Sequence, residues 1–295
     1  DDLTVVGDLD VDGTTNLDVV DIDGAVQIDA TLSVGVNDTG YDVKFFGATA
    51  SRHMTWDESA DSLIISGDLD VNDGTIKLDG NYPVGTGNVA LGDAALSSVE
   101  AGGNYNVAIG SAAGDAITTG DSNIGIGLNA LGTTTTASEN IAIGLNAMLA
   151  NTTGASNVGI GTYALNANTT ASQNTAVGYQ AGYTNTTGTR LSALGYKALF
   201  GNTTGSYDTG LGWGALVSNT TGDYNTAVGD SALLNNTTAD NNTAVGFEAL
   251  KLNTTGDSST SVGYQALATA TTGNSNSAFG TEALKYTTTG IRNSA

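Results

Sequence analysis

The sequence predicts an all-β protein, built mainly as a parallel β-roll or β-helix solenoid of 17-residue coils. Three observations predict it: the composition, a strict internal repeat, and apolar–polar alternation near the N-terminus. The 295 residues include 41 Gly, 1 Pro and no Cys, and only 13% of them are charged. The abundant Thr and Val favour strands, whereas the abundant Gly and Asn favour turns.

A glycine opens each repeat of the chain. It occurs at residues 92, 110, 127, 144, 161, 178, 195, 212, 229, 246, 263 and 280, so that the first step is 18 residues and each later step is 17. We number the unit from this glycine. Position 4 is Ala in every copy, positions 9 and 10 are Thr-Thr from Thr118 to Thr289, and position 8 is Asn in the seven copies from Asn151 to Asn253. A period held over about 190 residues predicts a solenoid.

The length of the unit selects a β-solenoid among the repeat folds. Helical repeats need about 33–47 residues, and the chain shows no 3.6-residue periodicity. We expect two strand-sized runs per coil, separated by corners at positions 1 and 11, because Gly accepts positive φ and close backbone approach. In the run that ends the unit, positions 15 and 17 point to one face and the small residue at position 16 points to the other.

Identical side chains would stack on their own copies from coil to coil. Asn at positions 8 and 14 and Thr at positions 9 and 10 would form hydrogen-bonded ladders. Ala at position 4 and Ala or Gly at position 16 would present a face almost without side chains, and so thin a coil would bury little apolar area by itself. We therefore expect that face to pack against sister chains in an obligate oligomer. The structural ladder residues are Ala181, Ala198, Ala215, Ala232, Asn185, Asn202, Asn219, Gly195, Gly212 and Gly229.

The N-terminal part follows a different pattern. Apolar and acidic residues alternate there, and the phrase GDLDV at 7–11 recurs at 67–71. Short apolar–polar strands separated by Gly predict a β-prism or triple-β-helix segment, in which each chain contributes one strand per turn. The predicted division is an acidic intertwined β shaft at 1–40, a small β-meander at 41–66, a second short shaft segment at 67–87, and at 88–295 a solenoid of about twelve repeats that we expect to continue beyond residue 295.

The charge of the chain bears on its partners. The formal net charge is −22, and residues 1–80 hold 18 acidic and three basic residues, a net of −15. Phosphate binding needs clustered Lys and Arg, so we expect no nucleic-acid partner. No stretch approaches about 18 continuous apolar residues, so we expect no membrane insertion.

One acidic motif in the N-terminal part resembles a metal site. Asp8, Asp10, Asp12 and Gly13 match the opening of an EF-hand loop, but Val19 stands where the Glu ligand belongs. Asp at alternate positions is more simply the solvated face of a strand, and calcium between chains is the alternative.

No catalytic residue and no cofactor are predicted. His53 lies near Asp57 and Glu58, but without a Ser or Cys motif around it we interpret it as structural. A polysaccharide depolymerase would need two facing carboxylates. Glu248 and Glu282 share position 3 but are two coils apart, with Gln265 between them, so this function is the least favoured.

Position 2 carries the candidate binding surface, an aromatic column that Asp230 interrupts. Aromatic platforms can stack sugars, whereas the structural alternative is a ladder that covers the edges of the coils. Asn-Thr-Thr is also an N-glycosylation sequon, but the repeat register explains it better, because the Thr pair persists where Asn is lost. The members of the column are Tyr179, Tyr196, Trp213, Phe247 and Tyr264.

The repeats resemble a known group of proteins. Tandem GYQALxxNTTGxxNTAVG units resemble the repeats of bacteriophage tail fibres, especially those of marine phages, and GDLDVDGTTNLDVVDIDGAV and DVKFFGATASRHMTWDESADSLII look like shaft segments of the same fibres. NTAVG and NSAFG are more distantly similar to the head repeats of trimeric autotransporter adhesins. The resemblance implies a homotrimer with a left-handed β-roll or related β-helix.

The resemblance also implies a function and a location. It implies a structural shaft of an extracellular virion tail fibre involved in host attachment, without catalysis. The implied partners are further copies of the chain, other fibre or virion proteins, and a host cell-surface glycan or protein receptor. The alternative is an adhesin or extracellular filament on a bacterial cell surface, whose repeats bind directly.

Overall fold

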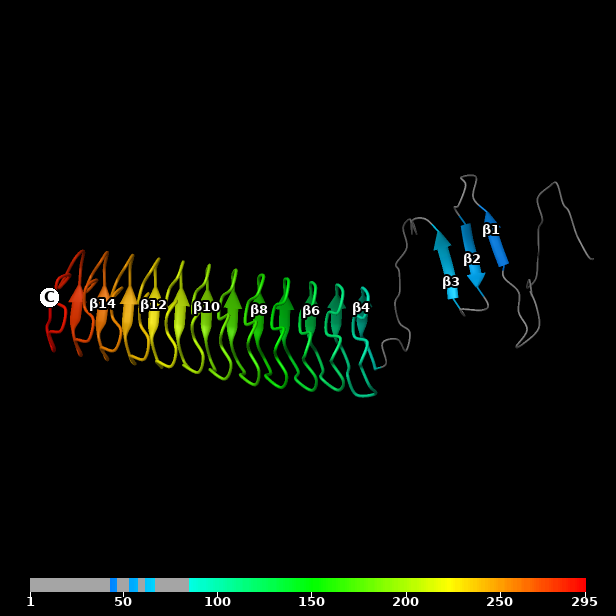
Figure 1. The fold of residues 1–295 in the computed structure, drawn as a ribbon, viewed down its shortest axis with the longest axis horizontal. Helices are drawn as coiled ribbons and strands as arrows, with labels where there is room; N and C mark the ends of the chain where they lie inside the picture. The colour runs from blue at the N-terminus through cyan, green and yellow to red at the C-terminus, as the bar shows by residue number, and fades with distance from the viewer. Residues whose placement is uncertain (1–42, 47–52, 58–61, 67–84) are drawn as a thin grey trace, which may run out of the picture. The chain divides into compact units, whose positions relative to one another are not determined.

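The computed structural model describes strand residues 43–46, 53–57 and 62–66 and all residues from 85 to 295 (Figure 1). The chain divides into two compact units, Asp1–Ile76 and Lys77–Ala295. The strands are β1 (Val43–Phe46), β2 (His53–Asp57), β3 (Ser62–Ser66), β4 (Val89–Leu91), β5 (Val107–Ile109), β6 (Ile124–Ile126), β7 (Ile141–Ile143), β8 (Val158–Ile160), β9 (Thr175–Val177), β10 (Ser192–Leu194), β11 (Thr209–Leu211), β12 (Thr226–Val228), β13 (Thr243–Val245), β14 (Thr260–Val262) and β15 (Ser277–Phe279).

The first unit contains a three-stranded antiparallel sheet with the order β1-β2-β3. Val43 pairs with Trp56, and His53 pairs with Ser66. The predicted β-prism segments, apart from residues 85–87, and the Asp8–Asp12 motif lie outside the described residues and stay predictions.

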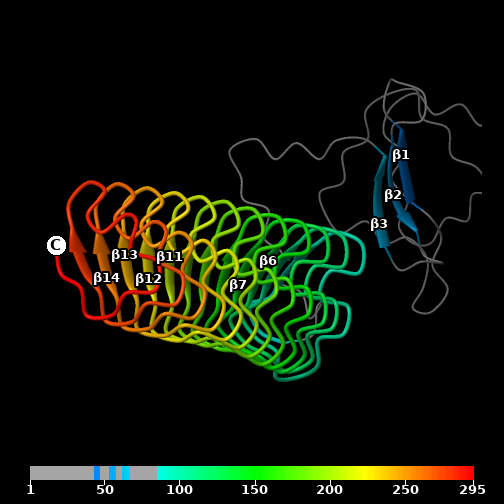
Figure 2. The ribbon, with the colours of Figure 1, turned by 60° about the vertical axis from the view of Figure 1, so that its left-hand side comes forward.

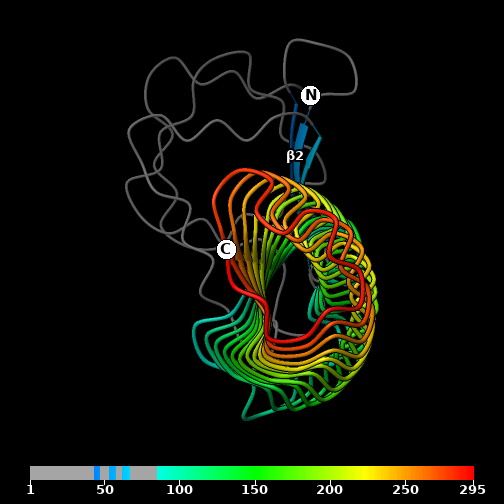
Figure 3. The same cartoon turned by 90° about the vertical axis from the view of Figure 1, so that its left-hand side faces the viewer.

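The second unit is a parallel β-solenoid. Strands β4 to β15 form one 12-stranded sheet in which each strand pairs with the next one along the chain. The pairing joins equivalent residues of consecutive repeats, as in Thr226↔Thr243. Figure 2 shows the sheet along one side of the stacked coils, and Figure 3, viewed along the stack, shows successive coils superposed with a gradual rotation. The predicted all-β solenoid with a 17-residue repeat is confirmed, and the described residues contain no helix.

Each coil contributes a single strand of three residues, at positions 15 to 17, so the expectation of two strands per coil is wrong. Turns make up the other side of the coil, because positions 3 and 5 adopt left-handed backbone, as Lys197 (φ 55°) and Leu199 (φ 52°) do. The backbone N–H of Asn202 donates to the Leu199 carbonyl, three residues earlier in the same coil, at 3.2 Å. The Leu199 amide donates to the Ala215 carbonyl of the next coil at 2.9 Å. Stacked turns therefore join consecutive coils as the strands do.

The two glycine corners differ in their requirements. Gly195 at position 1 has φ +130°, and a Cβ there would lie 2.4 Å from the Gly212 carbonyl oxygen. From Gly120 onward position 11 has no positive φ, contrary to expectation, and there only the close approach favours a small residue. Position 13, with residues such as Tyr207 (φ 62°), supplies the left-handed backbone at that corner.

The small residues lie inside the coil. Ala198 at position 4 and Leu199 at position 5 have no exposed surface in the isolated chain, and Ala193 at position 16 is 1% exposed. These columns form one apolar core from Ala130 to Ala278, and the first coils contribute a second, smaller cluster between Ala95 and Ile117. The expectation that the alanine face packs against sister chains is therefore wrong, as is the expectation of little buried apolar area. Small residues fit at these positions because the two sides of one coil come close together, while the Leu column fills the remaining volume.

Candidate binding surface

The Asn columns lie inside the coil and are fully hydrogen-bonded. Nδ2 of Asn202 donates to Oδ1 of Asn185 at 3.0 Å and to the Gly205 carbonyl at 2.9 Å. Nδ2 of Asn219 donates in turn to Oδ1 of Asn202 at 3.0 Å. All three Asn side chains have no exposed surface. The amide nitrogens of the Asn-Thr-Thr sequons are thus occupied inside the folded coil.

The two Thr columns have different environments. Thr203 at position 9 donates its hydroxyl to the Thr220 carbonyl of the next coil at 2.9 Å, and the same contact recurs along the solenoid. Thr204 at position 10 is exposed. Position 9 therefore joins the coils, whereas position 10 lines the surface.

The Asn column at position 14 is interrupted by Leu191, Asp208 and Ser259. An Asn Oδ1 of this column accepts the backbone N–H of the next coil, as Asn225 does from Asn242, and the Ser259 hydroxyl does the same for Asn276. Leu191 offers no such oxygen to Asp208. Asp208 has no exposed surface. It accepts the Asn225 N–H at 2.7 Å and Asn219 Nδ2 at 3.1 Å. Burial raises the pKa of Asp208 to about 8, and the charges of Asp223 and Asp240 add to the increase.

The outer face of the sheet is apolar at one end of the solenoid. Positions 15 and 17 point outward, and position 16 points inward. In β9, and from β11 to β14, position 15 is Thr, but in β5 to β8 both outward positions are Val or Ile. Parallel sheets are ordinarily covered on both faces. The outward residues of β5 to β8 are Val107, Ile109, Ile124, Ile126, Ile141, Ile143, Val158 and Ile160.

The aromatic column at position 2 lies on the surface beside the C-terminal ends of the strands. Tyr179 stacks on Tyr196 with centroids 5.4 Å apart, and Tyr196 stacks on Trp213 at 6.0 Å. Phe247 stacks on Tyr264 at 5.4 Å. Because the rings stack face to face, they cover one another's faces and turn their edges to solvent. A sugar could therefore lie flat only on a ring at the end of a stack.

A second aromatic column, at position 13, was missed in the sequence. Tyr207 stacks on Tyr224 with centroids 4.7 Å apart, and the Arg190 guanidinium lies 5.0 Å from the Tyr207 ring centroid. These three residues are exposed. Their signal in the sequence is their spacing, since each follows the previous one by 17 residues.

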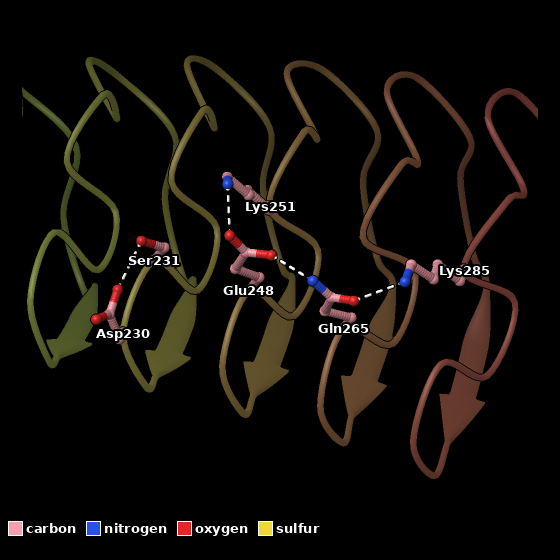
Figure 4. A network of polar contacts seen from close by, with 6 residues as sticks. All are labelled: Asp230, Ser231, Glu248, Lys251, Gln265 and Lys285. Atoms are coloured by element: carbon pink, nitrogen blue, oxygen red, sulfur yellow. Dashed lines mark hydrogen bonds and ion pairs between the residues drawn. The ribbon is translucent and has the colours of Figure 1, made fainter.

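Glu248, an acidic residue at position 3, belongs to a surface network of polar contacts (Figure 4). Glu248 accepts hydrogen bonds from Lys251 Nζ and Gln265 Nε2, both at 2.6 Å. Lys251 first, and Gln265 next, hold the pKa of Glu248 below its ordinary value. Lys285 Nζ lies 2.7 Å from Glu282 Oε1. Each carboxylate is paired with its own lysine, so this column does not have the two facing carboxylates of a glycosidase.

Within the described ranges there is no group of three or more His, Asp or Glu side chains that could hold a metal ion. No helix in the same ranges is long and apolar enough to cross a membrane. The side chains of His53 and Asp57, and Glu58 as a whole, lie outside what the structure describes.

Comparison of the chain with protein-family models, with curated proteins and with solved structures gave no match.

Proposed function

We propose that this chain forms the structural shaft of an extracellular trimeric fibre, a bacteriophage tail fibre that takes part in host attachment. One observation carries the proposal: consecutive repeats stack in register through a single 12-stranded sheet. Every 17 residues lengthen such a stack by about 4.8 Å. The fold therefore converts repeat number directly into length, which is what a shaft requires.

The apolar outer face of β5 to β8 supports the trimeric state. The inner face of the sheet packs on the coil's own core, and the outer Val and Ile side chains are partly exposed in a single chain. Covering them with further copies of the chain would remove apolar surface from water. Strands β5 to β8 follow one another along the solenoid axis. Copies of the chain aligned with their axes parallel would therefore cover this apolar outer face.

Sedimentation equilibrium tests this assembly. A trimer should sediment as a particle of about 88 kDa, three times the 29.4 kDa chain. Ile141→Lys places a charge in the apolar outer face and should release folded monomers. Thr243→Lys makes the same change at the same repeat position in β13 and should leave the trimer intact. A wild-type chain that stays monomeric at micromolar concentration would refute the trimer.

The exposed aromatic columns favour a second candidate, a bacterial cell-surface adhesin whose repeats bind directly. Antibodies against the purified chain distinguish the two locations by electron microscopy. Labelling along the fibres of phage particles supports the shaft, and labelling of a bacterial envelope supports the adhesin. Release of new reducing ends from a host polysaccharide would instead support the depolymerase.

A further inference from the structure

The aromatic column at position 2 is interrupted between two exposed rings, at Asp230. Trp213 precedes this residue by one repeat, and Phe247 follows it by one repeat. The Trp213 ring lies within 4° of parallel to the Tyr196 ring, and the Phe247 ring within 11° of the Tyr264 ring. Each ring therefore has one face covered by its stacked neighbour, and its other face is turned toward the coil of Asp230.

The interval between these two ring faces is set by the coil spacing. Two coil steps separate Trp213 from Phe247. The coil spacing of about 4.8 Å and the ring distances of single steps together place the two rings roughly 10–12 Å apart. Single steps along the same column give centroid distances of 5.4 to 6.0 Å. Trp213 is 54% exposed and Phe247 is 41% exposed, so solvent reaches both rings. Asp230 is shorter than a ring side chain, and its carboxylate lies at the backbone end of the interval.

The charge at this place suits a cation. The Asp230 carboxylate accepts one hydrogen bond, from the Ser231 hydroxyl at 2.7 Å (Figure 4). A cation midway between the rings would lie about 5–6 Å from each, within the roughly 6 Å over which a cation is attracted to a ring face. In residues 85–295 the Lys and Arg side chains that contact rings lie on Tyr196, Phe200, Tyr207 and Tyr286.

We propose that Trp213, Asp230 and Phe247 form a binding site for a methylated ammonium group. A flat guanidinium touches both rings only when they are about 7 Å apart, which is twice a contact distance of roughly 3.5 Å. A methylated ammonium is more than one atomic layer thick, and it therefore fills more of the wider interval than a guanidinium does. Its low hydration also favours transfer to a ring face, and the carboxylate supplies the opposite charge.

Titration of the full-length chain with tetramethylammonium chloride tests the site. Saturation-transfer NMR on the ligand methyl signal, at constant ionic strength, should show saturable binding with a dissociation constant on the order of 1–10 mM. Guanidinium and methylammonium should bind at least about five-fold more weakly. Absence of saturable binding, or equal binding of guanidinium, would overturn the proposal.

Three variants locate the binding. Asp230→Asn keeps the shape but removes the charge, and should weaken binding about five-fold or more. Asp230→Tyr completes the column and should abolish binding, and its circular dichroism should match that of the wild type because Tyr occupies position 2 at Tyr179, Tyr196 and Tyr264. Asp93 also lies at position 2, but the next coil carries Ser111 there in place of an aromatic ring. Asp93→Asn should therefore have no effect on binding. Unchanged binding in Asp230→Tyr would refute the site.

Binding of two further ligands distinguishes the possible biological sources of the ammonium group. Nε-trimethyllysine represents a protein side chain, and phosphocholine represents a lipid or polysaccharide headgroup. The ligand that binds at least as tightly as tetramethylammonium identifies the source. Failure of both to bind would contradict a biological role for the site.

Discussion

Replacement of the buried acid Asp208 by Asn should stabilise the solenoid at neutral pH. The pKa of Asp208 is about 8 in the folded chain, against an ordinary value of 3.8. The folded state therefore holds a proton that the unfolded state releases between about pH 4 and pH 8. One pKa unit corresponds to about 1.4 kcal/mol, so at pH 7 the carboxyl group lowers the free energy of unfolding by about 4 kcal/mol relative to its effect in acid.

The sign of this effect fixes its pH dependence. Because the folded pKa is raised, the contribution of Asp208 to stability is greatest below pH 4, falls as pH rises to about 8, and is constant above that. In Asp208→Asn the introduced amide matches the Asn residues elsewhere at position 14. Because this amide does not titrate, the loss of stability between pH 4 and pH 8 is absent. The difference in unfolding free energy between variant and wild type should therefore grow by about 4 kcal/mol from pH 4 to pH 7.

Urea unfolding followed by far-UV circular dichroism, at several pH values, measures this difference. Asp93→Asn, at an exposed carboxyl group, serves as the control for general charge effects. A difference between Asp208→Asn and wild type that stays constant from pH 4 to pH 8 would refute the assignment of the raised pKa to Asp208.

Three further predictions concern the repeat itself. Gly195→Ala should cost at least about 3 kcal/mol of unfolding free energy, because its φ of +130° suits only glycine. Gly159→Ala should cost under about 1 kcal/mol, because Ala stands at position 16 in other coils and a Cβ there would lie 3.2 Å from its nearest atom, in the Met148 side chain; equal urea midpoints would contradict this. Asn202→Ala should cost about 2–4 kcal/mol, since it leaves buried partners without hydrogen bonds, and exposed Thr204→Ala should change stability by less than about 0.5 kcal/mol. After expression in a secretory pathway that attaches N-glycans, mass spectrometry should find the folded fraction unmodified at Asn185 and Asn202, whose side chains are buried; a folded, glycosylated chain would disprove the ladder.

The period and register of the solenoid could be predicted from the sequence, because stacking places equivalent residues side by side. Whether each face of the coil turns inward or outward could not be predicted from side-chain size alone. Alternation at positions 15 to 17 separates two faces, but a small residue fits both the interior of a thin coil and a close contact between chains. The informative residue was position 5, where Leu131, Leu165 and Leu199 repeat as only a core residue would, and all three are fully buried.

The turn side of the coil had no recognisable signal in the sequence. Left-handed backbone usually appears as Gly or Asn, but here residues as different as Lys197, Leu199 and Tyr207 adopt it. Their conformation is imposed by hydrogen bonds to the neighbouring coils, which no single repeat reveals. The second aromatic column was missed for a different reason: it consists of only Tyr207 and Tyr224, and two copies do not stand out among the varied residues at position 13.

Distances between spin labels test the stacking of the coils most directly. The chain has no cysteine, so pairs of cysteines can be placed at the exposed Thr residues of position 10 and labelled without background. Thr153 and Thr238 are five coils apart, and Thr119 and Thr272 are nine coils apart, which gives distances of about 24 Å and about 43 Å at 4.8 Å per coil. Dilution with unlabelled chain removes contributions between chains. Electron–electron double resonance should return these two values, and distances that do not increase in proportion to the number of coils would contradict the solenoid.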